Sequence, residues 1–220
     1  MNFNKVKAIG VTVPVIEDIP DSEGLISYSA RVSNPKNQNN FETANKLLAY
    51  CARNSHWSIF EMCNVILEIE TPRDIARQIL RHRSFNFQEF SQRYAVAQEF
   101  VKRNARLQDQ KNRQNSIEAE DDALNAWWEY EQQSLIEHVE SVYQEALEKG
   151  IAKEVARVIL PEGNTMSRMY MNGTIRSWIH YCQLRRGNGT QAEHKDVADK
   201  CAKILQEHFP SLAEHFGEEL

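Results

Sequence analysis

Cysteine is scarce in this sequence, and none of the four cysteines lies within two to four residues of another. The spacings of zinc knuckles and redox CxxC sites are therefore absent, and we expect no metal site. Each cysteine stands beside apolar residues in a helix- or strand-like run, which predicts reduced thiols in the core. A cysteine nucleophile stays open as the alternative for Cys182, which lies near other candidate residues. The others are Cys51, Cys63 and Cys201.

Long apolar runs are also missing, and none approaches the ~20 residues that a membrane helix needs. Lys5 and Lys7 interrupt the N-terminal stretch too early for the core of a signal peptide. No internal repeat and no linker rich in proline, glycine or serine divides the chain, which predicts one domain over residues 1–220. A domain of this size can bury about 70% of its unfolded surface. We expect a cytoplasmic protein without membrane contact.

Negative charge is in excess, with a formal net charge of −5, but it is unevenly distributed. Residues 116–149 hold ten acids and one base, whereas residues 73–93 hold five arginines and two acids. Residues 150–190 hold six bases and two acids. We expect the two basic segments to gather around an anion. A small phosphorylated ligand fits this pattern better than a nucleic acid, because nucleic-acid binders are more often basic overall.

The periodicity of apolar residues predicts an α+β fold with a central, mainly antiparallel sheet flanked by long helices. Alternating apolar residues predict strands near the N-terminus, at 64–70 and at 167–172. We expect residues 102–116 to form a surface loop, and the tryptophans at 127 and 128 to anchor a core helix. Helical spacing and helix-start or helix-stop residues predict helices at 41–54, 71–83, 119–149, 152–160, 174–185 and 191–209.

The most informative stretch is QILRHRSFNFQEFSQRY, residues 78–94. Arg81, His82 and Arg83 are consecutive, so their side chains cannot all point the same way, and such a triplet can reach ligands on different sides. Arginine suits an anionic ligand, because its planar fork grips phosphate oxygens bidentately and keeps its charge. A helix C-terminus attracts one or two cations through its dipole. That effect does not explain why Glu89 and Ser91 follow so closely.

This stretch resembles the signature of the flavin-dependent thymidylate synthases. The arginine–histidine–arginine triplet is followed by seven residues and Ser91, with Glu89 before the serine and Arg93 and Tyr94 after it. The resemblance covers about residues 29–209. Other segments agree in order, namely SARVS at 29–33, SHWSIFE at 55–61, EVARVILP at 154–161 and GTIRSWIHYCQLR at 173–185.

The resemblance implies a reaction, in which deoxyuridine monophosphate (dUMP) is reductively methylated to thymidylate (dTMP). Methylenetetrahydrofolate gives the carbon, tightly bound FAD carries it and supplies the hydride, and NADPH re-reduces the flavin. Because the sequence contains no dinucleotide GxGxxG motif, we expect NADPH to bind outside a Rossmann site. The resemblance also implies a homotetramer whose active sites draw residues from several subunits.

Site residues follow from the same resemblance, position by position. The dUMP site is expected to comprise Gln78, Ile79, Leu80, Arg81, Glu89, Phe90, Ser91, Gln92, Arg93, Arg157 and Arg185. The FAD site is expected to comprise Ser33, Ser58, Arg81, His82, Arg83, Glu89, Thr174, Ile175, Arg176 and His180. His56 is a further candidate for a flavin or folate contact.

Arg185 resembles the family residue placed against the uracil ring, and it is the expected catalytic residue. A fixed cation beside the ring imide favours the imide anion, since a nearby opposite charge typically lowers a pKa by ~1–3 units. Ionisation pushes electron density toward the ring carbon that attacks the methylene group, so no cysteine adduct is needed. Ser91 is expected to contact substrate without acting as a nucleophile, because no serine–histidine–acid arrangement is evident.

The sequence departs from the family pattern at Met62, Asn86 and Gln88, which affects the expected folate contacts most. Two other functions stay open. One is a nucleic-acid-binding module, in which an arginine stripe meets phosphates and phenylalanines stack on bases. The other is a flavoprotein that uses the same pocket without this reaction. A colourless protein would favour the first, and a flavin insensitive to dUMP would favour the second.

Overall fold

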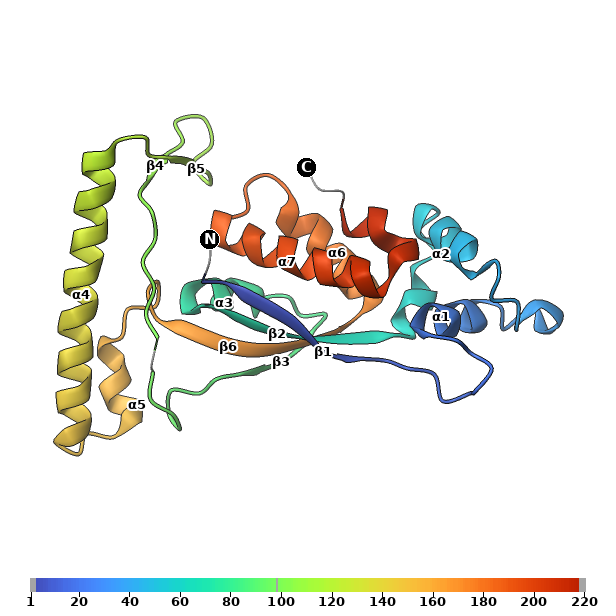
Figure 1. The fold of residues 1–220 in the computed structure, drawn as a ribbon, viewed down its shortest axis with the longest axis horizontal. Helices are drawn as coiled ribbons and strands as arrows, with labels where there is room; N and C mark the ends of the chain where they lie inside the picture. Colours follow the sequence, from blue (N-terminus) through green and yellow to red (C-terminus); the bar gives the residue numbers. More distant parts are fainter. Residues whose placement is uncertain (1–2, 98, 218–220) are drawn as a thin grey trace.

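A central antiparallel sheet organises the computed structural model, which describes residues 3–97 and 99–217 (Figure 1). Its strands lie in the order β1-β2-β6-β3, and each neighbouring pair is antiparallel. A separate hairpin pairs β4 with β5. This arrangement confirms the predicted α+β fold. The strands are β1 (Lys5–Val11), β2 (Asn64–Pro72), β3 (Asn86–Glu89), β4 (Arg106–Gln108), β5 (Ser116–Glu118) and β6 (Met166–Thr174).

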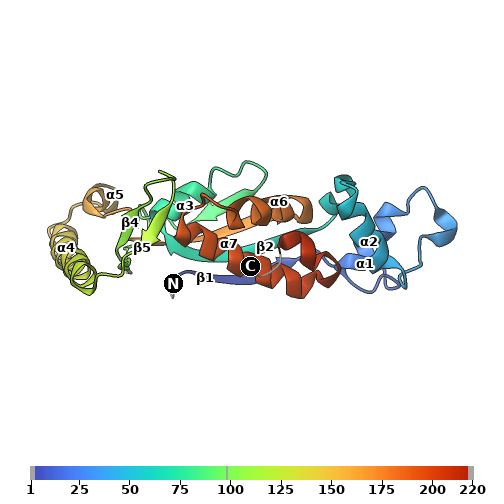
Figure 2. The same ribbon diagram turned by 90° about the horizontal axis from the view of Figure 1, so that it is seen from above.

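Helices α3, α6 and α7 cover one face of the sheet, while α1 and α2 lie beyond one end and α4 and α5 beyond the other (Figures 1 and 2). Within the described residues, no helix has the length and apolar character that crossing a bilayer requires. The helices are α1 (Ser22–Ala30), α2 (Ala44–Arg53), α3 (Arg73–Ile79), α4 (Asp122–Glu148), α5 (Lys153–Ala156), α6 (Ile175–Arg186) and α7 (Ala192–His208). Short 3₁₀ helices span Pro35–Asn37, Trp57–Glu61, Arg157–Ile159 and Pro210–Phe216.

The main core lies between the sheet and these covering helices. Val65, Leu67 and Ile69 alternate along β2 and are fully buried, as the sequence predicts. The stripe of α7 that contains Val197 and Leu205 is fully buried against them. Removing this apolar surface from water provides the main driving force for folding. The opposite face of the sheet carries ion pairs, in which Glu70 meets Lys5 at 3.1 Å and Arg168 at 2.7 Å.

All four cysteines are free and buried, which confirms the predicted core thiols. Burial raises the pKa of Cys182 to about 12 and that of Cys63 to about 11. A thiol that stays protonated at neutral pH is a poor nucleophile. The structure therefore removes Cys182 as a candidate nucleophile.

The prediction that the two tryptophans of α4 anchor the core is wrong. Trp127 and Trp128 are 55% and 39% exposed, so neither is the core anchor that the periodicity suggests. The helix instead buries Ile136, Val139 and Tyr143 against the short segments around Ala97 and Leu160. Helix α4 lies at the edge of the molecule (Figure 1), and the residues that it buries fully lie in its middle.

Several short elements are additions to the predicted fold. Residues 102–116 are not simply a loop, since they include β4 and the start of a hairpin. The periodicity of apolar residues also does not predict the edge strand β3 or helix α1. Glycine is required at Gly173, where β6 passes Phe85, because an added Cβ would lie 2.3 Å from the Phe85 ring.

Candidate functional site

Two helices meet above the middle of the sheet. Helix α3 follows β2, and α6 follows β6, with no loop at either junction. Pro72 pairs with Met166 and Asn64 pairs with Thr174, so the two helices start at opposite ends of the same strand pair. Seven and twelve residues of helix together span about 28 Å. Nine residues of strand span about 30 Å, so the two C-terminal ends come close together.

The arginine–histidine–arginine triplet lies in the turn after α3. The helix ends at Ile79 rather than near Arg83, because the chain turns there toward β3, and the His82 N–H bonds the Ile79 carbonyl at 3.0 Å. Arg81 and Arg83 are exposed, whereas His82 is half-buried. The middle side chain is therefore less exposed than its two neighbours, as expected for consecutive residues that cannot all point the same way.

His82 contacts Arg185 across this junction. The Arg185 Nε donates a hydrogen bond to His82 Nε2 at 2.8 Å. Burial, assisted by the charges of Arg185 and His180, lowers the pKa of His82 to about 4. His82 is therefore neutral at pH 7, and its proton lies on Nδ1 because Nε2 accepts. The bond uses one of the five guanidinium donors and orients the others for a ligand.

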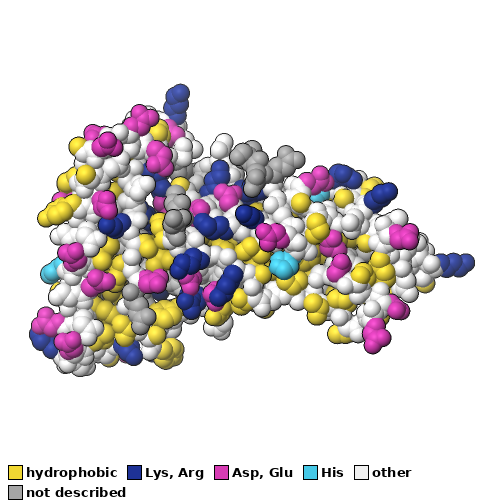
Figure 3. Space-filling view, viewed as in Figure 1, with side chains coloured by type: hydrophobic (Ala, Val, Ile, Leu, Met, Phe, Trp, Pro, Cys, Tyr) yellow, Lys and Arg dark blue, Asp and Glu magenta, His cyan; other side chains and the backbone are white. Residues whose placement is uncertain are grey.

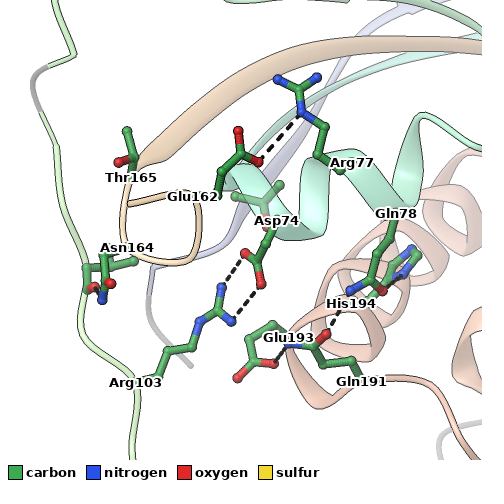
Figure 4. A network of polar contacts seen from close by, with 12 residues as sticks. Asp74, Arg77, Gln78, Arg103, Glu162, Asn164, Thr165, Gln191, Glu193 and His194 are labelled. Carbon is green, nitrogen blue, oxygen red and sulfur yellow. Dashed lines mark hydrogen bonds and ion pairs between the residues drawn. The ribbon is translucent and has the colours of Figure 1, made fainter. Parts of the chain in front are cut away.

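Gln78 is held by a second polar network (Figure 4). Its Nε2 donates to Gln191 Oε1 at 2.7 Å, and its Oε1 lies 3.2 Å from His194 Nδ1. His194 Nε2 in turn lies 3.2 Å from the Tyr181 hydroxyl. Burial lowers the pKa of His194 to about 3 and raises the pKa of Tyr181. A neutral His194 that accepts from Tyr181 and donates to Gln78 satisfies every contact and fixes the Gln78 amide.

His194, Tyr181 and Gln191 are not among the site residues predicted from the sequence. The one available signal is that His194 falls on the buried stripe of α7, three residues before Val197. A histidine on such a stripe is usually a satisfied core residue. Its link to Gln78 becomes visible only when α3 and α7 are packed together.

We expect His194 to make the protein less stable in acid. The unfolded chain binds a proton near pH 6.5, but the folded chain does so only near pH 3. The free energy of unfolding is therefore highest above pH 7 and falls as the pH drops through 6.5. Between pH 7 and pH 5 the loss from His194 should be about 2 kcal/mol. Urea unfolding at both pH values measures it.

Two variants control this measurement. His194→Gln should reduce the difference between pH 7 and pH 5, since glutamine does not titrate. His208→Gln, at an exposed position of the same helix, should keep the full difference. An unchanged pH dependence in His194→Gln would contradict the assignment.

Glu89 forms the centre of another group of predicted residues. Its carboxylate accepts hydrogen bonds from Arg77 Nη1 at 3.0 Å and from Ser167 Oγ at 2.9 Å. Arg73 adds an ion pair at 3.6 Å. Glu162 pairs with both arginines from the opposite side, and Figure 4 shows its contact with Arg77. Arg77 thus faces the Glu89 group, whereas the next residue, Gln78, faces His194.

The loop that follows Glu89 extends this group toward α5. The Phe90 N–H donates to the Arg168 carbonyl at 2.8 Å, which attaches the loop to β6. Arg93 pairs with Glu154 at 3.2 Å, and Arg157 follows three residues later. Gln92 is buried, and its amide nitrogen has no hydrogen-bond partner among the described residues.

Two of the residues expected to bind flavin line a cavity of about 430 Å³ beside α6. Arg176 and His180 line it, together with Ser84, Glu61 and Trp57. Arg176 pairs with Glu61. Side chains that donate hydrogen bonds, next to one aromatic wall, are the kind of lining that a flavin ring requires.

The remaining expected flavin residues lie elsewhere or are occupied. Thr174 caps α6 through its hydroxyl, which accepts from the Ser177 N–H at 3.2 Å. Ile175 is fully buried, as is Ile79 of the expected dUMP site, so both side chains belong to the core. Ser58 and His56 are exposed at the short helix beside the cavity.

Ser33 lies outside this cavity. It follows α1 and lines a different cavity together with Arg31, Lys46 and Tyr50. Within one chain, Ser33 therefore lies at the end of the molecule that holds α1 and α2 (Figure 1). The residues expected to bind FAD form two separate sets in a single chain.

The predicted segregation of charge is visible on the surface. Figure 3 shows Lys and Arg side chains gathered over the sheet, and Asp and Glu side chains spread over α4. Basic and acidic side chains are therefore concentrated on different parts of this face.

Comparison with known proteins identifies relatives over nearly the whole chain. Residues 14–211 match the family described as "Thymidylate synthase complementing protein". A probable flavin-dependent thymidylate synthase of Paramecium bursaria Chlorella virus 1 is 54% identical over 208 residues, which cover 94% of this chain and 96% of the relative. A flavin-dependent thymidylate synthase of Synechocystis sp. is 52% identical over 211 residues, which cover 94% and 97%.

A solved structure shares the fold. The UMP/dUMP methylase PolB of Streptomyces cacaoi, bound with 5-Br dUMP, superimposes with a TM-score of 0.80 over 97% of this chain and 94% of that chain, at 24% identity. The motifs, the antiparallel sheet and the relatives agree with one another. The chain therefore belongs to the flavin-dependent thymidylate synthase family.

Proposed function

We propose that this protein converts dUMP to dTMP, with methylenetetrahydrofolate as carbon donor and NADPH as reductant. The contact between Arg185 and His82 carries the proposal. This contact joins the C-terminal part of α6 to the turn that follows α3, four residues after Gln78. We assign this activity to the cytoplasm, because four unpaired cysteines suit a reducing compartment.

The residues present fit a flavin. The cavity beside α6 offers Arg176, His180 and Ser84 as polar contacts for the edge of the ring. Arg81 and Arg83 are exposed, and neither side chain has a partner among the residues described, so both are available to the pyrophosphate. A bound FAD would supply the hydride and carry the methylene group.

We assign dUMP to the two groups of residues around α3. Arg185 would lie against the uracil imide and stabilise its anion, and Gln78 would present a fixed amide to the same ring. The loop from Phe90 to Arg93, with Arg157, would hold the phosphate and the sugar. With its cysteines buried, the chain has no thiolate for a covalent adduct, so the ring carbon itself would be the nucleophile.

A homotetramer would complete this site. The residues around Gln78, which would bind the uracil ring, and those around Arg93, which would bind the phosphate, lie on different sides of α3 within one chain. The two sets of flavin residues are also separate. Both separations support a site in which one subunit contributes the phosphate loop and another contributes Arg185.

The purified protein tests this function directly. We expect the yellow absorbance of bound flavin, which NADPH should bleach. Under anaerobic conditions, adding dUMP and methylenetetrahydrofolate together should reoxidise the flavin and yield dTMP, measured by chromatography. A yellow protein that gives no dTMP would contradict the proposal and favour a different flavoprotein. A colourless protein that binds oligonucleotides would favour the nucleic-acid module.

A further inference from the structure

A cavity of about 700 Å³ lies outside the site described so far. It is bounded by the first turns of α4, the β4–β5 hairpin and the loop that joins α6 to α7. Figures 1 and 2 both show this hairpin beside that loop. Its volume falls in the range of pockets that hold small molecules and cofactors.

The lining of this cavity is strongly cationic. Arg103, Arg106, Arg113 and Lys195 line it, and no carboxylate does so within the described part of the chain. Two of these cations form ion pairs with carboxylates that do not line the cavity. Asp74 receives two hydrogen bonds from Arg103, at 2.9 and 2.5 Å, and Figure 4 shows this pair.

Glu193 neutralises the second cation, since it binds Arg106 at 2.6 Å. The side chains of Arg113 and Lys195 have no partner among residues 3–97 and 99–217. Two positive charges without a partner among the described residues therefore line a cavity of a protein whose net charge is −5. Such a focused field attracts anions.

The same cavity has an aromatic wall. Trp127 and Trp128 line it, with ring centroids 6.1 Å apart, and both indoles keep substantial exposure. Exposed indoles beside cations form a surface on which a planar base can stack. Gln191 also lines the cavity while it bonds Gln78, so the cavity adjoins the proposed dUMP site.

We propose that this cavity binds the nucleotide reductant, with a base against the indoles and phosphates at Arg113 and Lys195. The identity of the ligand rests on the proposed function. The lining favours NADPH over the folate, because NADPH carries a pyrophosphate and a 2′-phosphate that several cations can bind, whereas the anions of the folate are the carboxylates of its glutamate tail. A phosphate-rich dinucleotide matches that lining.

Calorimetric titration of the flavin-loaded protein with NADP⁺, which binds without reducing the flavin, tests the proposal. The Arg113→Gln, Lys195→Gln double variant should weaken NADP⁺ binding at least about tenfold. Trp127→Leu should weaken it too and should reduce the quenching of tryptophan fluorescence. Lys111→Gln removes an exposed cation of the same hairpin that does not line the cavity, and it should leave the affinity unchanged. The affinity for dUMP should stay the same in every variant.

Three results would overturn the assignment. They are the absence of NADP⁺ binding to the unaltered protein, unchanged NADP⁺ affinity in the double variant, and a loss confined to tetrahydrofolate. Failure of the proposed function is distinguishable, since the protein would then make no dTMP whether or not NADP⁺ binding depends on these cations.

Discussion

Arg185→Ala should reduce kcat for dTMP formation by about 100-fold or more while the flavin stays bound. Removing one preorganised group that stabilises developing charge typically costs a factor of that size. In this protein Arg185 is oriented by its bond to His82, so the alanine variant loses both the cation and its fixed direction. Steady-state turnover gives the rate, and the flavin absorbance of the purified variant gives the cofactor content.

Two further variants separate charge from geometry. Arg185→Lys keeps a cation but lacks the guanidinium fork, so we expect an intermediate kcat. Lys203→Ala removes an exposed cation from α7 and should leave kcat unchanged. Because the charge of Arg185 depresses the pKa of His82, that pKa should rise in the alanine variant. A kcat within twofold of the original would remove Arg185 from its proposed role.

Trp178→Ala should have the largest effect on folding, a loss of about 3–5 kcal/mol in the free energy of unfolding. The indole is fully buried, its centroid lies 4.8 Å from that of Phe85, and its Nε1 donates to the Val65 carbonyl at 3.1 Å. The substitution would leave a large cavity and an unsatisfied carbonyl between α6 and the sheet. Urea unfolding at pH 7 measures the change.

Two matched substitutions show how much of this loss in stability depends on the buried position of Trp178. Trp178→Phe should cost less, because an aromatic ring still packs against Phe85 and the cavity is smaller, although the indole hydrogen bond is lost. Trp127→Ala truncates an exposed indole and should change stability by about 0.5 kcal/mol or less. A loss below 1 kcal/mol for Trp178→Ala would show that the core tolerates the cavity.

The core of the sheet and of α7 could be predicted from the sequence because each buries a whole periodic face. Val65 and Leu67 alternate, and Val197 and Leu205 repeat at helical spacing. Helix α1 could not be predicted in this way, since one of its buried residues is Glu23. That carboxylate receives the N–H and hydroxyl of Ser211, at 2.9 and 2.8 Å, across almost the whole chain.

The candidate site was predictable only as a set of residue positions. Gln78 and Arg185 stand in recognisable motifs, but their mutual placement depends on the antiparallel pairing of β2 and β6. His194 gives no signal of its own, because its partner Gln78 is 116 residues away. The arginines that line the large cavity are close together in the sequence, but they meet Lys195 of α7 and the tryptophans of α4 only after these helices are packed.

The loop-free junctions between β2 and α3, and between β6 and α6, limit how this protein can evolve. One residue inserted into α6 would rotate Arg185 by about 100° around the helix axis and swing it away from His82. The same insertion in the segment between α6 and α7 would leave that pair intact. Length variation is therefore disruptive within α6 and in the turn after α3 that holds His82, whereas the segment between α6 and α7 can change in length without moving either partner.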